Sequence, residues 1–208
     1  SGVFSWEKRE RVGGVGKVGW VSYNTNMSLP YENQIVYKQA VIIFDLNDYF
    51  CKTYLNNYAE KRTVEQMQQA SRSGKQNIVE GVSEISTDLK IKLVAVSRAS
   101  YHELLEDYKD YLSRNQLKLW DKNDSRLALV KFSSSTYQTY ITYKTLPLNI
   151  KKFLTKPESF CNLMITLLNR EIYMLGKLVK TLECQFIKTG GYRENLTKKR
   201  LDYRKKIQ

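Results

Sequence analysis

The feature that most constrains this chain is a long apolar pattern near its C-terminal end. From about Glu158 to Lys188, apolar residues recur every three to four positions. They are Phe160, Leu163, Met164, Leu167, Leu168, Ile172, Leu175, Leu178, Val179, Leu182 and Phe186. This period predicts one long helix with an apolar stripe. Gly190-Gly191 follows it directly and is typical of a helix C-terminus.

Three further helices are predicted upstream. The first runs from about Glu32 to Asn57. The second starts near Thr63, where Thr63 to Gln66 fits a capping box. The third follows Ser86-Thr87-Asp88 and ends near Arg114. Because the chain holds only 3 prolines among 208 residues, nothing in these segments breaks a helix.

The remaining segments are less regular. Arg126 to Lys144 favours helix, although its tyrosines and threonines also allow a strand. Leu196 to Lys206 is a cationic tail that can continue as a short helix. We therefore predict an all-α protein: an antiparallel up-down four-helix bundle with an additional C-terminal helix and a basic tail.

The domain organisation follows from these elements. Residues 1–30 are rich in glycine and form an irregular N-terminal extension. Residues 31–157 are the helical bundle core with a basic connecting region, and residues 158–208 are the helix that closes the bundle plus the tail. Whether the extension is native or translation starts at Met27 is left open by the sequence.

Positive charge is concentrated in the second half of the chain, whose net charge is +13. Residues 31–113 carry 10 basic and 12 acidic side chains. Residues 114–157 carry 9 basic and 2 acidic side chains, and residues 158–208 carry 11 basic and 5 acidic ones. A localised positive field attracts polyanions, so the composition favours a nucleic-acid partner.

The cysteine and histidine content points away from metal chemistry. Cys51, Cys161 and Cys184 are far apart and form no CxxC pair, and His102 is the single histidine. We expect no metal site, and reduced cysteines that behave as small buried hydrophobes in a cytoplasmic protein. No apolar stretch is long enough for a membrane span, and Trp6 to Arg11 is charged where a signal peptide would be apolar, so no membrane contact is expected.

The second helix carries the most specific local motif, Arg72-Ser73-Gly74-Lys75-Gln76-Asn77-Ile78-Val79-Glu80-Gly81. Small residues on one face, Ala70 and Gly74, predict that a neighbouring helix approaches closely there. The stretch resembles the signature of a four-helix-bundle family, which includes the intervening-sequence proteins of bacterial large-subunit ribosomal RNA and the accessory variability determinant of diversity-generating retroelements. The matching positions are Arg72, Asn77, Ile78, Glu80 and Gly81.

Two other stretches are similar to the same family. Tyr37-Lys38-Gln39-Ala40 resembles its first helix, and Leu93 to Ser100 followed by Glu103-Leu104 resembles its third. The stretch from Leu182 to Glu194 is similar to a C-terminal suffix on one branch. The resemblance implies a pentameric ring, a basic surface that binds RNA or DNA, a reverse transcriptase as partner in the retroelement members, and no catalysis.

The motif residues form one candidate set, for structure or for partner contact. It comprises Arg72, Gly74, Asn77, Glu80 and Gly81. Asn77 and Glu80 share a helix face because they lie three residues apart. We favour a structural network in which Glu80 pairs with Arg72 or Arg98, since a lone carboxylate without a second acid or histidine is a poor catalyst.

No constellation supports an enzyme or a cofactor. Gly13 to Val18 resembles a phosphate loop, but no Ser or Thr follows Lys17. The acidic stripe of Glu103, Glu106, Asp107 and Asp110 lacks the Glu-x-x-His pairs of bundle metal sites, so we expect a solvated or docking face. We predict no catalytic residue.

The tail is the candidate nucleic-acid site. Its residues are Lys198, Lys199, Arg200, Tyr203, Arg204, Lys205 and Lys206. The cations suit phosphates and Tyr203 suits base stacking. Tyr137, Tyr140 and Tyr143, by contrast, are expected to pack in the core.

Two functions follow. The first is a non-enzymatic nucleic-acid-binding accessory protein that assists a reverse transcriptase. The alternative is an oligomeric helical scaffold for protein–protein interaction without nucleic-acid binding.

Overall fold

The described residues fold into helices and short turns, with no β-strand among them. A computed structural model describes residues 34–130, 137, 140 and 142–207. The α-helices are α1 (Ile35–Tyr54), α2 (Lys61–Ser83), α3 (Thr87–Arg114), α5 (Leu148–Lys151), α6 (Pro157–Thr189) and α7 (Tyr192–Ile207). The 3-10 helices are η1 (Tyr58–Glu60), η2 (Leu127–Leu129), η3 (Tyr143–Thr145) and η4 (Lys152–Thr155).

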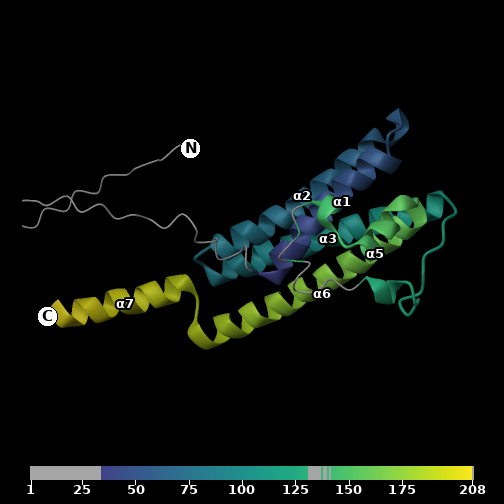
Figure 1. The fold of residues 1–208 in the computed structure, drawn as a ribbon. Helices are drawn as coiled ribbons and strands as arrows, with labels where there is room; N and C mark the ends of the chain where they lie inside the picture. Colours follow the sequence, from purple (N-terminus) through teal and green to yellow (C-terminus); the bar gives the residue numbers. More distant parts are fainter. Residues whose placement is uncertain (1–33, 131–136, 138–139, 141, 208) are drawn as a thin grey trace, which may run out of the picture.

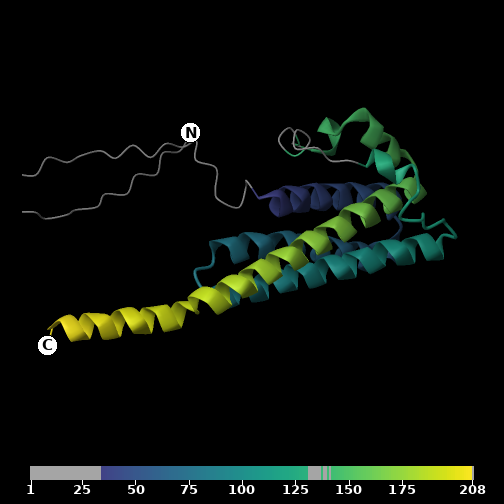
Figure 2. The ribbon, with the colours of Figure 1, turned by 90° about the horizontal axis from the view of Figure 1, so that it is seen from below.

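Four helices make the packed part of the molecule, which we call the helical body. Helix α3 packs on α2 and on α6, and α1 packs on α2 and on α6. Neighbours run in opposite directions: Asp48 meets Gln68 at one level of α1 and α2, whereas Phe44 meets Lys75 further along. Figures 1 and 2 show α6 crossing the whole body and α7 projecting beyond it.

The predicted helices are present with shifted ends. Helices α3 and α6 begin and end within about one residue of the bounds predicted for the third helix and for the long helix near the C-terminus. The capping box at Thr63 is wrong: α2 already begins at Lys61, so Thr63 lies inside the helix. The preceding turn η1 runs directly into α2, and the Asn57 side chain caps that turn instead, accepting from the backbone N–H of Ala59 at 3.4 Å.

The prediction of a single helix from Arg126 to Lys144 is also wrong, because neither end of this segment is α-helical. Of the described residues there, Tyr137 lies in an α-helix, the ends form the 3-10 helices η2 and η3, and Val130 and Tyr140 are outside any helix. The segment is instead fixed to α1 through Asp45, which accepts hydrogen bonds from the Tyr140 hydroxyl and from the Tyr143 backbone N–H. These contacts hold Tyr140 and Tyr143 against α1 outside any α-helix.

The three tyrosines of this segment pack inward, as predicted. Tyr137 is buried and its hydroxyl donates to Gln39 Oε1 at 2.6 Å. Tyr143 stacks on Tyr49, with ring centroids 4.2 Å apart. These rings hold the connecting segment on the helical body.

The cysteine prediction is confirmed at two positions of three. Cys51 and Cys161 are free and buried. Cys184 is exposed, because it lies in the C-terminal part of α6, where few side chains are buried against other helices. The N-terminal extension, the glycine loop at Gly13 to Val18 and Met27 lie outside the described residues.

The close approach predicted at Gly74 is confirmed. A Cβ at Gly74 would lie 2.5 Å from Cζ of Tyr101, far inside any real contact. The backbones of α2 and α3 are close enough here for the Ser97 hydroxyl to donate to the Gly74 carbonyl at 2.7 Å. Tyr101 is fully buried. A glycine at position 74 is therefore required by packing.

A buried carboxyl faces the same tyrosine from α6. Glu171 is fully buried, and neither of its carboxyl oxygens nor the Tyr101 hydroxyl has a hydrogen-bond partner among the described residues. Burial raises the pKa of Glu171 well above its usual range, with Arg170 opposing the shift. Burial and the nearby Glu171 also raise the pKa of Tyr101. Burial therefore favours the protonated form of Glu171 in the folded protein.

The two glycines of the second helix give a matched pair of variants. Gly74→Ala is expected to destabilise the protein by about 1–3 kcal/mol, because overpacking against Tyr101 outweighs the helix propensity gained. Gly81→Ala is expected to be neutral or slightly stabilising, since its Cβ would lie 3.4 Å from Leu93 and Val94, an ordinary contact. Urea denaturation followed by circular dichroism measures both. Equal effects of the two substitutions would contradict the close approach at Gly74.

Glu171 predicts a pH dependence of stability. Its folded-state pKa lies above the unfolded value of about 4.3, so its contribution is fully present below that pH and is lost as pH rises towards the folded-state pKa. One such carboxyl gives a slope of at most about 1.4 kcal/mol per pH unit. We expect Glu171→Gln to raise the midpoint of thermal unfolding at pH 8 and to flatten its pH dependence. A midpoint lowered by Gln at pH 8 would show that the charged carboxylate is stabilising.

Candidate nucleic-acid interface

Helix α7 projects from the end of α6 and carries the cationic tail. The element contacts place α1, α2, α3 and α6 against one another and give α7 no comparable partner. None of its residues is buried. Figures 1 and 2 show α7 leading away from the helical body. The predicted tail residues therefore stand on one exposed helix.

The junction between α6 and α7 has a defined geometry. Gly190 adopts φ +74°, a left-handed conformation that favours glycine, and its backbone N–H donates to the Phe186 carbonyl at 2.8 Å. The Gly191 backbone N–H donates to the Glu194 carboxylate at 3.2 Å. The Asn195 side-chain amide donates to the Thr189 carbonyl at 3.0 Å. Both helix ends are thus capped at the bend.

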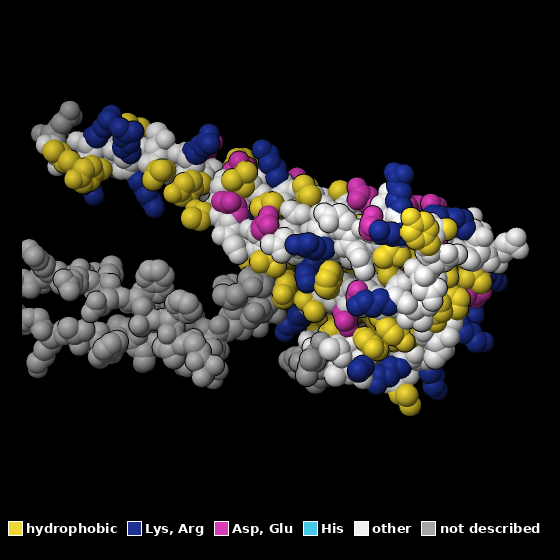
Figure 3. Space-filling view, turned by 90° about the horizontal axis from the view of Figure 1, so that it is seen from above, with side chains coloured by type: hydrophobic (Ala, Val, Ile, Leu, Met, Phe, Trp, Pro, Cys, Tyr) yellow, Lys and Arg dark blue, Asp and Glu magenta, His cyan; other side chains and the backbone are white. Residues whose placement is uncertain are grey.

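Cations surround α7. The helix has seven basic and two acidic residues, and none of the cations forms an ion pair with a described residue. At about 100° per residue the seven cations fall on all sides of the helix, while four apolar or aromatic residues share one stripe. The stripe is Tyr192, Leu196, Tyr203 and Ile207. Figure 3 shows dark-blue side chains interleaved with yellow ones along this arm.

This arrangement suits a phosphate backbone. Each ammonium or guanidinium group on α7 is open to solvent and can pair with a phosphate, and Tyr203 is 67% exposed and can stack on a base. All seven predicted tail residues are placed together by the helix.

The residues of the predicted motif do not converge on one site. Gly74 and Gly81 are packing positions against α3. The Asn77 side-chain amide donates to the Ser73 carbonyl at 2.9 Å in its own helix. Glu80 is exposed and accepts from Gln76 at 3.2 Å. It forms no ion pair with any described residue, so the predicted pairing with Arg72 or Arg98 is not observed.

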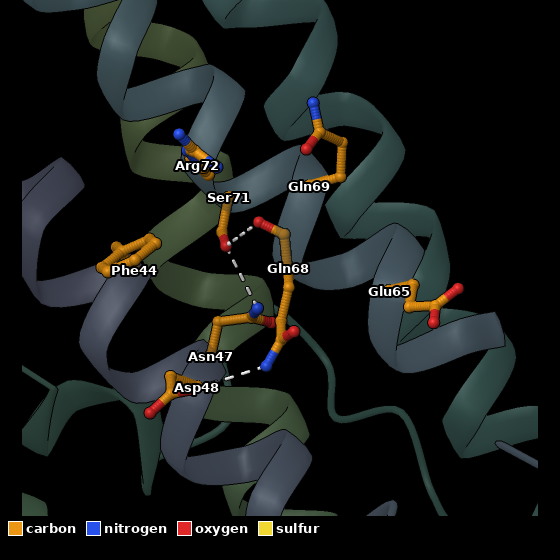
Figure 4. A pocket seen from close by; sticks show the side chains of 8 residues that line it. All are labelled: Phe44, Asn47, Asp48, Glu65, Gln68, Gln69, Ser71 and Arg72. Atoms are coloured by element: carbon orange, nitrogen blue, oxygen red, sulfur yellow. Dashed lines mark hydrogen bonds between the residues drawn. The ribbon is translucent and has the colours of Figure 1, made fainter. Parts of the chain in front are cut away.

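Arg72 lines an open groove of about 460 Å³ between α1 and α2. Figure 4 shows the groove and its hydrogen bonds. Its central amide, Asn47, donates to the Met67 carbonyl and to Ser71 Oγ and accepts from the Tyr108 hydroxyl. Because the amide is satisfied within the protein and acids line the groove beside Arg72, the groove does not suit a polyanion.

A second cation beside this groove is partly withdrawn from solvent. Lys75 lies over the Phe44 ring, with its Nζ 3.8 Å from the ring centroid. Burial, with a smaller contribution from Arg72, lowers the pKa of Lys75.

The acidic stripe lies on the outer face of α3. Glu103, Glu106 and Asp110 are exposed, and Asp107 is partly buried. Burial and the neighbouring Asp110 raise the pKa of Asp107 to about 6. Lys109 pairs with Glu106 at 2.8 Å. The negative charge of this face is unfavourable for a polyanion.

A second group of cations lies where α6 begins, and sequence reasoning did not single it out. The described residues of 115–156 include seven basic and two acidic side chains. Four of these lysines are exposed and lie close to the start of α6 or to the loop packed on it; we call them the loop-end lysines. They are Lys118, Lys122, Lys152 and Lys156. Their only signal in the sequence is the summed charge of the segment.

No family model, curated protein or solved structure matches this chain. Among the described residues, no three histidine, cysteine or acidic side chains are grouped so as to hold a metal ion. No described helix is both long and apolar enough to cross a membrane.

Proposed function

We propose that this protein is a non-enzymatic nucleic-acid-binding accessory protein that holds phosphate backbones through α7. The observation that carries the proposal is the exposed helix with seven cations and no ion pair to a described residue. Neutralising phosphates with such side chains releases counterions, which drives binding that depends on salt but little on sequence.

We also propose how the helices are arranged. The helices α1, α2, α3 and α6 form an antiparallel up-down four-helix bundle, and α7 is an additional C-terminal helix with the basic tail. The antiparallel contacts between neighbouring helices support this description. In this arrangement the bundle is the support and α7 is the binding element.

The proposal also includes the family. The resemblance of the stretch from Arg72 to Gly81 supports membership of that four-helix-bundle family, as a cytoplasmic homo-oligomer that forms a pentameric ring. RNA or DNA would be its polyanion, and a reverse transcriptase its protein partner. Buried free thiols at Cys51 and Cys161 accord with a reducing compartment.

A second candidate function is an oligomeric scaffold that binds protein only. The acidic face of α3 favours it, because Glu103, Glu106 and Asp110 offer a complementary surface to a basic neighbouring subunit. In that case α7 would complete the assembly instead of binding nucleic acid.

Replacing six cations of α7 with alanine tests the first function. The positions are Lys198, Lys199, Arg200, Arg204, Lys205 and Lys206. We expect affinity for RNA or DNA at low salt to fall at least about tenfold, and the slope of log K against log salt to flatten by up to about 5, since six phosphate contacts are lost. Gel shifts over a salt series measure both quantities.

The control for this variant is Lys92, Arg98, Lys177 and Lys180→Gln, which removes exposed cations of the helical body. Affinity and slope unchanged in the α7 variant would show that α7 is not the site. A ring seen by light scattering, without nucleic-acid binding even at low salt, would favour the scaffold.

A further inference from the structure

The two cationic regions lie at opposite ends of the helical body. Helix α7 follows the C-terminal end of α6, whereas the loop-end lysines surround its N-terminal end. Figure 2 shows α7 and the segment containing α5 at the two extremes of α6. Sequence-based charge sums combine these regions as one basic half, but the fold separates them.

The loop-end lysines are held on a fixed segment. The Asn162 amide donates to the Lys118 carbonyl at 2.9 Å, and the Trp120 backbone N–H donates to Asn162 Oδ1 at 2.8 Å. The Trp120 indole N–H donates to Glu158 at 2.7 Å. The Arg126 guanidinium lies over the Trp120 ring, 3.6 Å from its centroid. These contacts bind the loop to the first turns of α6.

The same contacts leave the lysine charges uncompensated. Three acids lie near this surface: Glu158 accepts from Trp120, Asp124 pairs with Arg126 at 2.6 Å, and Asp121 accepts from the Asn123 backbone N–H at 2.8 Å. None of the four loop-end lysines forms an ion pair with a described residue. This end therefore presents positive charge to solvent, as α7 does.

The distance between the two cationic regions limits the length of nucleic acid that could contact both. Helix α6 has 33 residues, and at 1.5 Å per residue it is about 50 Å long. A ten-base-pair duplex is only about 34 Å long at 3.4 Å per base pair, so it cannot reach both ends. The acidic face of α3 between them disfavours a duplex lying along that face.

We infer that the protein has two separate polyanion-binding surfaces, α7 and the loop-end lysines, and that it holds two nucleic-acid segments at once. The inference rests on the proposed function and extends it from simple binding to bridging. The loop-end surface is complementary in charge to a phosphate backbone, which identifies its occupant as a second nucleic-acid segment. Bridging raises the local concentration of one segment near the other.

Energy transfer between two ten-base-pair duplexes, one carrying a donor dye and the other an acceptor, tests bridging by the full-length protein at low salt. Wild type is expected to give transfer that rises and then falls as protein exceeds duplex. Two variants each remove four charges: Lys118, Lys122, Lys152 and Lys156→Gln, and Lys198, Lys199, Lys205 and Lys206→Gln. Each is expected to keep binding duplex, by anisotropy, but to saturate at one duplex per chain where wild type saturates at two, a ratio that does not depend on whether copies assemble.

The matched control is again Lys92, Arg98, Lys177 and Lys180→Gln, which should retain transfer. Wild-type binding without transfer would overturn bridging and leave the proposed function standing. A loop-end variant that still saturates at two duplexes per chain would also overturn it, because the second surface would then lie elsewhere. No binding of either duplex by wild type would overturn the proposed function as well.

Discussion

The rest of the structure depends on the position of the Tyr101 ring, which fills the space where any side chain at position 74 would lie. This contact lets α2 and α3 approach until Ser97 hydrogen-bonds the Gly74 carbonyl. It also directs the tyrosine into the core, where its hydroxyl faces Glu171 of α6. One close approach therefore fixes the relative positions of three helices.

Buried polar side chains link the helices of the helical body through hydrogen bonds. Asn47 links α1 to α2 and α3 through buried hydrogen bonds, and the Gln39 amide donates to the Leu167 carbonyl on α6. Such buried amides are satisfied within the protein and specify how helices pair. Groups of exposed cations lie at the two ends of the helical body, on α7 and around the start of α6. The helical body thus lies between two groups of exposed cations.

Sequence patterns predicted the parts of the fold that local periodicity controls. The α6 stripe, α3 and the small residue at Gly74 all follow from spacing along one helix. The start of α2 was missed because the 3-10 turn η1 runs directly into α2, which begins at Lys61 without a side-chain cap. The loop-end surface and the burial of Glu171 were missed because each is created by packing between segments distant in sequence. For the tail, the cations were evident from sequence, but its isolation from the body was not.

Lysine acetylation read by mass spectrometry, with and without a ten-base-pair duplex at low salt, tests the central claim most directly. The account predicts that reactivity falls at both ends and persists between them. The protected lysines should be Lys118, Lys122, Lys152, Lys156, Lys198, Lys199, Lys205 and Lys206, whereas Lys92, Lys177 and Lys180 stay reactive. Protection centred on the lysines of the helical body, with both ends unchanged, would contradict the account.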